Sequence, residues 1–283
     1  MPLVSIREEL KKAQEGKYAI PSFNAFDLFG AEGIIDALEE KRAPGMLAIY
    51  SGVLDQSRAR PLIAAARLIA QEATVPVSLY LDHGASPVHC VKALSLGFSD
   101  VMYDGSKLSL EENTANTRGV VEVAHALGAA VEAEIGHVGD GSSYQDFGAK
   151  REGFTDPDSA VRFVEETGVD VLAIAIGTAH GEYQGEPQLA LDLLAEIEEK
   201  VEVPLVLHGG SGLSEELFRA AVAGGICKIN IFTDLALAAR DGMVEVAGGE
   251  NASYFALTKQ IPEGFRKRCC YHLDLFGTTN RAG

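Results

Sequence analysis

The stretch Val171-Leu172-Ala173-Ile174-Ala175-Ile176 is a run of six apolar residues with no polar alternation. A strand of this kind is covered on both faces, as in a parallel sheet that lies between helices. Seven further β-rich runs occur along the chain, separated by amphipathic stretches. The eight expected strands are residues 19–23, 45–51, 75–83, 100–104, 129–136, 169–177, 204–210 and 226–233.

The stretches between these strands carry helix start signals. Pro87 after Ser86 suits the first helical position, and acidic residues after Pro157 and Ser214 favour the positive end of a helix dipole. Eight strands that alternate with helices predict an α/β fold, a (β/α)8 TIM barrel formed by residues 1–283 as a single domain. A doubly wound open sheet is the alternative, which the lack of a Gly-x-Gly-x-x-Gly after the first strand disfavours.

Two segments do not fit the simple strand–helix repeat. Residues 138–155 are polar, glycine-rich and long for a connection between a strand and a helix. Connections of this length in a compact domain are usually lids or binding elements, so we expect a mobile active-site loop. Residues 254–275 predict an extra C-terminal helix.

Composition restricts the partners and the compartment. The chain has a formal net charge of −17, whereas nucleic acids and anionic membranes both bind basic surfaces. No run approaches the roughly 20 apolar residues of a membrane span, and the N-terminus lacks a signal-peptide pattern. We therefore expect a cytoplasmic protein, with reduced thiols because no pair has CxxC spacing. The cysteines are Cys90, Cys227, Cys269 and Cys270.

Three histidines lie at the ends of expected strands. His83 follows the third strand, His180 the sixth and His208 the seventh, and a glycine comes directly after each. Chemistry in these barrels takes place at the C-terminal ends of the strands, where the three side chains would converge. Three imidazoles leave a metal ion one open position, as in a catalytic site. The alternative is that each histidine only caps a strand through backbone hydrogen bonds. The other histidines have no such placement and are expected to be surface or structural: His89, His125, His137 and His272.

The loops after the seventh and eighth strands predict a phosphate site. Gly209-Gly210-Ser211-Gly212 precedes a helix that begins near Ser214, and the eighth strand ends in Asn230-Ile231-Phe232-Thr233-Asp234. Loops at these two positions form the recurrent phosphate site of such barrels, with backbone amides and small hydroxyls as donors.

These motifs together resemble those of class II ketose-bisphosphate aldolases, most closely the fructose- and tagatose-bisphosphate branch. The resemblance rests on Leu81-Asp82-His83-Gly84, Gly177-Thr178-Ala179-His180-Gly181, Leu207-His208-Gly209-Gly210-Ser211-Gly212 and Lys228-Ile229-Asn230. It runs in order from Phe23-Asn24 to about Thr233, which is most of the chain.

The resemblance implies a reaction and a role for each matching residue. A ketose 1-phosphate or 1,6-bisphosphate would be cleaved reversibly to dihydroxyacetone phosphate and an aldehyde, by a homodimer or homotetramer. His83, His180 and His208 would bind one catalytic Zn²⁺, and Asp82 would exchange the proton of the C4 hydroxyl. Asp104 and Glu134 would hold an alternate metal position, and a monovalent cation, Na⁺ or K⁺, would lie near the phosphate. The residues implied around the substrate and its phosphate are Asn24, Ser51, Gly181, Gly209, Ser211, Asn230 and Thr233.

The chain departs from the family pattern at two places. The early motif often continues with a second Asn and a Glu, where this chain has Asp27 and Phe29. The mobile loop usually carries a Glu that acts on the C3 proton, and Ser142 stands at that position. Three carboxylates of the loop are alternatives for the missing acid: Asp140, Asp146 and Glu152.

Other functions compete with the aldolase reading. A zinc hydrolase on the same barrel would usually have a His-x-His pair on an early strand, and this chain lacks one. A Schiff-base aldolase could use Lys228, because burial in the eighth strand would lower the pKa of its amine. A catalytically altered barrel that only binds sugar phosphates is the third alternative.

Overall fold

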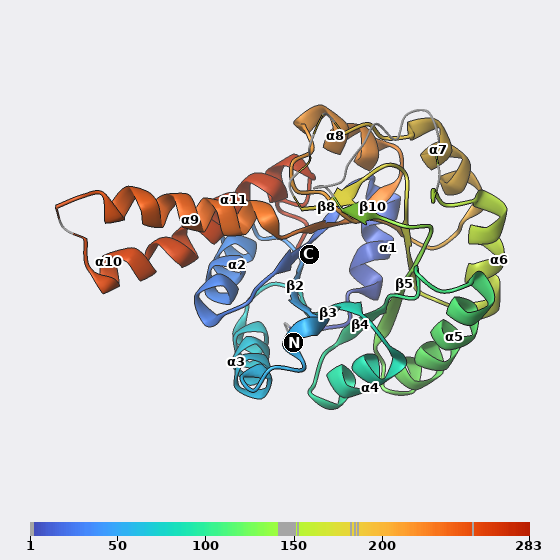
Figure 1. Cartoon of the computed structure of the whole chain (residues 1–283), viewed down its shortest axis with the longest axis horizontal. Helices are drawn as coiled ribbons and strands as arrows, with labels where there is room; N and C mark the ends of the chain where they lie inside the picture. The colour runs from blue at the N-terminus through green and yellow to red at the C-terminus, as the bar shows by residue number, and fades with distance from the viewer. Residues whose placement is uncertain are drawn as a thin grey trace.

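Eight parallel strands close into a barrel, with helices alternating around it (Figure 1). The structure is a computed structural model that describes residues 3–140, 151, 153–181, 183, 185, 187–250 and 252–283. Around the barrel the strands follow the order β1-β10-β9-β7-β5-β4-β3-β2, so β1 pairs with β10 and no edge stays open. This closure confirms the TIM barrel and excludes the open doubly wound sheet. The barrel strands are β1 (Ile20–Asn24), β2 (Gly45–Tyr50), β3 (Val77–Gly84), β4 (Asp100–Tyr103), β5 (Ala130–Ile135), β7 (Val171–Ile174), β9 (Leu205–Leu207) and β10 (Ile226–Ile231).

All eight expected strands are present, but two of them end three residues earlier than predicted. The sixth strand of the barrel, β7, ends at Ile174, and the seventh, β9, ends at Leu207. The segments that follow them are loops, and a two-stranded sheet of β6 (Gly139–Asp140) and β8 (Ala179–His180) lies outside the barrel. The helices are α1 (Arg7–Gly16), α2 (Leu28–Glu40), η1 (Ser51–Val53), α3 (Ala59–Glu72), α4 (Pro87–Ser95), α5 (Leu110–Ala126), α6 (Pro157–Thr167), α7 (Leu191–Lys200), α8 (Glu215–Ala223), α9 (Thr233–Ala247), α10 (Tyr254–Thr258) and α11 (Gln260–Leu275).

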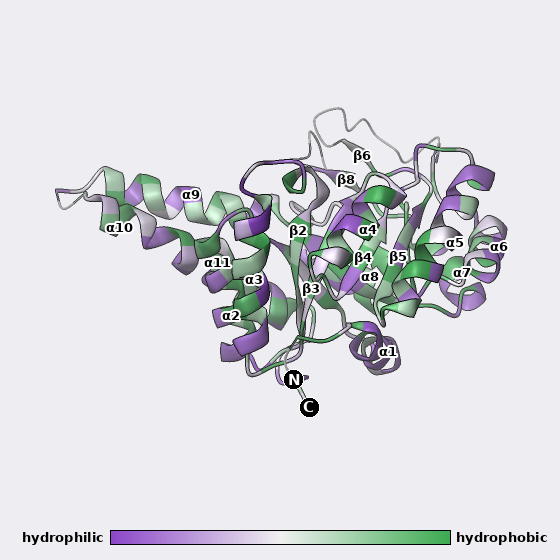
Figure 2. Cartoon of the chain, turned by 90° about the horizontal axis from the view of Figure 1, so that it is seen from below, coloured by the Kyte–Doolittle hydropathy of each residue, from purple (hydrophilic) through white to green (hydrophobic). Residues whose placement is uncertain are grey.

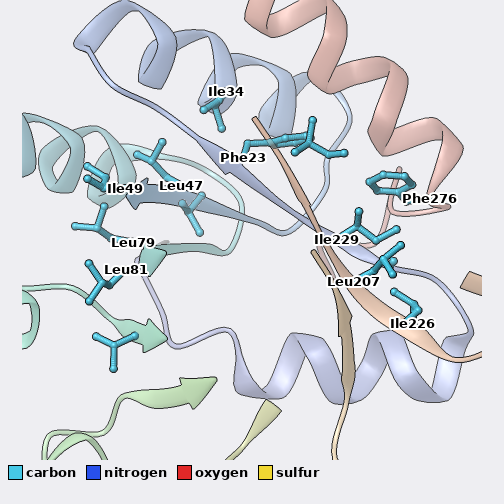
Figure 3. Close-up of a cluster of buried hydrophobic side chains, with 14 of the residues drawn as sticks. Phe23, Ile34, Leu47, Ile49, Leu79, Leu81, Leu207, Ile226, Ile229 and Phe276 are labelled. Atoms are coloured by element: carbon cyan, nitrogen blue, oxygen red, sulfur yellow. The ribbon is translucent and has the colours of Figure 1, made fainter. Parts of the chain in front are cut away.

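The core has an inner and an outer layer. The outer layer lies between the strands and the surrounding helices, where Ile34 projects from α2 toward the strands that carry Phe23 and Leu47 (Figure 3). Burial of each such side chain contributes roughly 1.5–3 kcal/mol. The inner layer fills the barrel, and α1 packs Ile6 and Leu10 into it. The sequence analysis did not predict α1, which closes the N-terminal end of the barrel and leaves the opposite end for a site.

Helices α9, α10 and α11 form an arm that projects from the barrel, the C-terminal arm (Figure 1, Figure 2). The single helix expected over residues 254–275 is two helices, α10 and α11, that meet at Lys259. Helix α11 packs against α2 and α9, and glycines permit the close approach. A Cβ at Gly33 would lie 2.4 Å from the Pro262 carbonyl oxygen, and one at Gly264 would lie 2.7 Å from Ala239 Cα. Helix α11 is therefore held rigidly against the barrel.

Two sequence expectations about the whole chain can be compared with the fold. All four cysteines are free and buried, which agrees with the prediction of reduced thiols. Among the described residues, no helix combines the length and the apolar character that crossing a bilayer requires.

Candidate active site

A cavity of about 850 Å³ opens at the C-terminal ends of the barrel strands. Eleven of the predicted site residues line it, and they come from every part of the chain. His208 and Ser51 do not line it, since both are buried, and Ser51 Oγ donates a hydrogen bond to the His83 carbonyl oxygen. The lining residues that the sequence predicted are Asn24, Asp82, His83, Asp104, Glu134, His180, Gly181, Gly209, Ser211, Asn230 and Thr233.

A local irregularity at the end of β3 allows neighbouring residues to face the same cavity. In a regular strand the side chains of Asp82 and His83 would point to opposite faces. Here the pairing of β3 with β4 shifts register between Leu81 and Gly84, and His83 has a φ of 50°, in the left-handed region. Such bulges commonly re-aim a side chain next to a functional site. As a result, Asp82 and His83 both line the cavity.

The three strand-end histidines meet at one point. One ring nitrogen from each of His83, His180 and His208 lies within 4.8 Å of the other two. His83 Nδ1 is bonded to Asp104 Oδ2 at 2.8 Å, and His208 Nε2 to Glu132 Oε1 at 2.8 Å. These bonds leave His83 Nε2 and His208 Nδ1 as the nitrogens of these two rings that are not bonded to Asp104 or Glu132.

This nitrogen cluster fits a metal ion. Among the described residues, His180 Nε2 is buried without a hydrogen-bond partner, and the buried His208 Nδ1 and Glu134 Oε2 have only each other, at 3.2 Å. Buried polar atoms without a partner are costly, and coordination to a cation would satisfy all three. His83 and His208 are each bonded to a carboxylate through one ring nitrogen, which leaves the other for the metal. Metal-binding histidines are usually oriented in this way. The three histidines therefore form a metal-binding triad, and His83, Asp104 and Glu134 form a second possible group.

The charges around the triad favour a cation. Burial lowers the pKa of His208, but its bonds and charge interactions with Glu132 and Glu134 outweigh this and raise the pKa to about 10. Burial and the two neighbouring histidines lower the pKa of His180 to about 4, so this ring is neutral and can donate its lone pair. For Asp104, burial raises the pKa, but the bond and charge of His83 lower it well below the usual range. The site thus stabilises positive charge at its centre.

A buried ion pair beneath the triad was not predicted from the sequence. Lys228 Nζ lies 2.9 Å from Glu132 Oε2 and donates to Asn230 Oδ1 at 2.6 Å. Burial raises the pKa of Glu132, but Lys228 and the bond from His208 lower it to about 2. The signal was the alternation in Val131-Glu132-Ala133-Glu134, which puts both carboxylates on one face of a strand. Only Glu134 was recognised.

Replacing Lys228 with methionine should destabilise the fold strongly. Lys228 and Glu132 are almost fully buried, so the variant would leave a buried carboxylate without its cation. We expect a loss of about 3–5 kcal/mol in the free energy of unfolding, measured by denaturant titration. Lys259→Met is the matched control, because its 3.5 Å pair with Glu263 is exposed and should contribute less than about 1 kcal/mol. Equal effects of the two substitutions would contradict this view of Lys228.

Asp82 is held between two asparagines. Asn24 Nδ2 donates to Asp82 Oδ2 at 2.8 Å, and Asn230 Nδ2 donates to Asp82 Oδ1 at 2.9 Å. His83 Nε2, one of the nitrogens of the triad, lies 4.0 Å from Asp82 Oδ1. Two amide donors therefore fix the carboxylate beside the metal-binding triad.

Three of the predicted phosphate residues lie on the loops after β9 and β10 and line the cavity: Gly209, Ser211 and Thr233. Gly209 adopts a φ of 67°, and a Cβ there would lie 2.3 Å from the Ala179 carbonyl oxygen, so only glycine allows β8 to pack on this loop. Tyr183 Oη donates to the Gly209 carbonyl oxygen at 2.6 Å and accepts from Ala179 N at 2.9 Å. Thr233 begins α9, whose N-terminus has no side-chain cap. Backbone amides at such a terminus can bind an anion.

The predicted loop is described only at its two ends. His137 N donates to the Gly153 carbonyl oxygen at 2.7 Å, and Thr155 Oγ1 donates to the Ile135 carbonyl oxygen at 2.7 Å. The backbone of Asp140 pairs with His180 in the small sheet, so the loop starts beside a histidine of the triad. The other loop residues singled out in the sequence lie outside the described residues, as does the side chain of Asp140: Ser142, Asp146 and Glu152.

The early departure from the family pattern has a structural explanation. Asp27 is the N-cap of α2, and its Oδ1 accepts from Gly30 N at 2.8 Å. Aromatic residues were missed as lining residues, and two of them form a pair, Phe26 and Phe232, with ring centroids 4.6 Å apart. They lie just after the ends of two paired strands, β1 and β10, and only these positions could have indicated the contact.

Comparisons with known proteins agree with this geometry. The chain matches the family described as fructose-bisphosphate aldolase class-II over residues 4–281. It is 42% identical over 237 residues to a 6-phospho-5-dehydro-2-deoxy-D-gluconate aldolase of Halalkalibacterium halodurans, covering 83% of this chain and 81% of the relative. It is 36% identical over 287 residues to a fructose-bisphosphate aldolase of Staphylococcus aureus, covering 100% of both chains. The crystal structure of the YdjI aldolase from Escherichia coli K12 superimposes with a TM-score of 0.89 and 35% identity, covering 99% of this chain and 100% of that one. The chain therefore belongs to the class II fructose-bisphosphate aldolase family.

Proposed function

We propose that the protein is a zinc-dependent aldolase that reversibly cleaves a ketose 1-phosphate or 1,6-bisphosphate to dihydroxyacetone phosphate and an aldehyde. The observation that carries this proposal is the position of Asp82 beside three imidazoles, each with a ring nitrogen within 4.8 Å of a ring nitrogen of the other two. Three nitrogen ligands with an open position suit Zn²⁺ in a catalytic site. The names of two relatives give different substrates, a 6-phospho-5-dehydro-2-deoxy-D-gluconate and a fructose bisphosphate, so the aldehyde half stays open in this proposal.

Asp82 would move the proton of the C4 hydroxyl. Cleavage of the C3–C4 bond requires that this proton leave as the aldehyde carbonyl forms, and the reverse reaction returns it. A carboxylate held at both oxygens, by Asn24 and Asn230, is oriented for one position of that hydroxyl. The two amides also keep Asp82 from turning toward the metal-binding triad.

The remaining parts of the site bind and orient the substrate. The ion held by His83, His180 and His208 would supply a Lewis acid for the electrons that remain at C3. The amides of Gly209 and of the first turn of α9, together with the hydroxyls of Ser211 and Thr233, would bind the C1 phosphate. The monovalent cation near that phosphate and the homodimer or homotetramer stay predictions.

The site and the family disfavour two alternative functions, a Schiff-base aldolase and a zinc hydrolase. Lys228 is not among the described residues that line the cavity, and its amine is committed to Glu132 and Asn230. A Schiff base at this lysine would require breaking a buried ion pair. Membership of an aldolase family disfavours a hydrolase on the same barrel.

The direct test is synthesis in the condensing direction. The zinc-loaded protein would be incubated with dihydroxyacetone phosphate and a panel of aldehydes, and the products identified by mass spectrometry and NMR. A ketose 1-phosphate product with at least one aldehyde is expected. Metal binding without any product across the panel would instead favour a barrel that only binds sugar phosphates.

A carboxylate of the loop over residues 138–155 is proposed to act on the C3 proton. Since Ser142 occupies the expected Glu position, we expect one of three variants to lose exchange: Asp140→Ala, Asp146→Ala or Glu152→Ala. Loss of an acid/base group should slow exchange of the C3 proton of dihydroxyacetone phosphate with solvent by roughly 10²–10⁴-fold, with the metal retained. Exchange is followed by NMR in deuterated water without any aldehyde, so the unknown substrate does not affect it. If all three variants exchange at the wild-type rate, the loop does not carry this acid.

A further inference from the structure

An acidic side chain at the start of α9 is bound by two residues of the C-terminal arm. Asp234 directly follows Thr233 at the proposed phosphate end of the cavity. Its Oδ2 accepts a hydrogen bond from Arg268 Nε at 2.6 Å and another from His272 Nε2 at 2.7 Å, both on α11. Thr233 lines the cavity, whereas Asp234 is not among the described lining residues. The arm thus holds this carboxylate off the cavity wall.

A free carboxylate at this position would oppose phosphate binding. The N-terminus of α9 has no side-chain cap from its N-cap residue, so the positive end of this helix can attract an anion. An acidic group in the first turn interacts favourably with the same helix end and would compete with a phosphate for it. It would also repel the phosphate directly, because both groups are negative. Neutralising Asp234 from the outer side removes both effects.

The two donors are themselves held in place. His272 is 1% exposed, and its ring centroid lies 5.8 Å from that of Phe218 and 5.3 Å from that of Phe276. Burial lowers the pKa of His272, whereas Asp234 raises it, and the effect of burial is the larger. The ring is therefore neutral and donates through Nε2. Arg268 lies over the ring of Tyr271, 4.3 Å from its centroid, and supplies the positive charge. The pair therefore combines one rigid donor with one cation.

The first turn of α9 is also tied to the other phosphate loop. Asp234 N points to Ser211 Oγ at 3.4 Å, so the loops after β9 and β10 are joined through this residue. Fixing Asp234 consequently fixes the relative placement of Ser211 and Thr233, the two hydroxyls of the proposed phosphate site.

We propose that Arg268 and His272 are positioning residues for phosphate binding, acting through Asp234 from the C-terminal arm. They neutralise a carboxylate that would repel the phosphate, and they fix the helix terminus that receives it. This inference rests on the proposed function, since it assumes that a sugar phosphate binds between Ser211 and Thr233.

The test is the variant Arg268→Gln in the zinc-loaded protein, assayed by exchange of the C3 proton of dihydroxyacetone phosphate. We expect the KM for dihydroxyacetone phosphate to rise on the order of tenfold, within the range of charge effects at a helix terminus. The exchange rate at saturation and the zinc content should stay at wild-type values. Arg266→Gln is the matched control, because Arg266 lies on the same helix and pairs with Glu40 instead.

A second variant separates charge neutralisation from simple bracing of the two helices. In Asp234→Asn/Arg268→Gln no carboxylate remains to repel the phosphate, so the KM should return most of the way to the wild-type value. A lower Tm with an unchanged KM in Arg268→Gln would overturn the inference and leave the contact as a brace between α9 and α11. Wild-type protein without any exchange would overturn the proposed function together with this inference, whereas an unchanged KM in Arg268→Gln overturns the inference alone.

Discussion

Replacing His208 with alanine is expected to abolish both metal binding and turnover. His208 is fully buried, and one of its ring nitrogens lies within 4.8 Å of those of His83 and His180, so it can complete the ligand set of a metal ion. Loss of one of three ligands removes the Lewis acid, which is worth several kcal/mol at the transition state, or on the order of 10³-fold in rate. Zinc content is measured by elemental analysis and turnover by aldol cleavage of the ketose phosphate identified in the synthesis test.

The control for this variant is His125→Ala. His125 is partly exposed and bonds to Asp170 at 2.8 Å at the other end of the barrel, so its loss should leave metal content and rate unchanged. Exhaustive chelation of the wild-type protein should reproduce the His208→Ala phenotype, and added Zn²⁺ should reverse it. Full activity after chelation would mean that the triad is not catalytic.

The variant Asp82→Asn should retain the metal and lose most of its cleavage rate. An asparagine cannot accept the C4 proton, and a well-placed acid/base group contributes roughly 10²–10⁴-fold. The new amide would face two donors, Asn24 and Asn230. Asn24 is the one that can turn its amide, because Asn230 Oδ1 already accepts a hydrogen bond from Lys228. The local structure should therefore persist.

Asp27→Asn provides the matched control for this substitution. The same change of charge is made at Asp27, which follows β1, two strands away from β3 around the barrel, and asparagine is an equally good N-cap for α2. Its rate should equal that of the wild type. A near-wild-type rate in Asp82→Asn as well would reduce Asp82 to a structural residue at the end of β3.

Much of the site could be predicted because it depends on strand ends. A histidine at the end of a barrel strand has few places to point, so His83, His180 and His208 could be assigned to one cluster without coordinates. The position of Asp82 was less predictable, since it depends on a register shift between β3 and β4 and on the left-handed backbone of His83. The residue type at His83 indicates neither the register shift nor the left-handed backbone.

The supporting residues were predicted least well, for a physical reason. Glu132 and Lys228 stabilise the site through a contact between strands in which the two residues are 96 positions apart in sequence. Likewise, Asp234 meets Arg268 and His272 only because α11 folds back on α9. Local patterns report what a residue does within its own element, whereas these pairings depend on how elements meet.

The pairing of β1 with β10 has a consequence for synthesis of the chain. Ile20 pairs with Lys228, so roughly 200 further residues must be synthesised before β1 can pair with β10. At about 5–20 residues per second, a ribosome needs on the order of 10–40 s to supply them. During that interval β1 is an open edge on a nascent chain. Pro21 lies within this strand and has no backbone N–H group that could donate a hydrogen bond. Pro21 therefore makes the open edge of β1 less able to pair with strands of other chains until β10 pairs with it and closes the barrel.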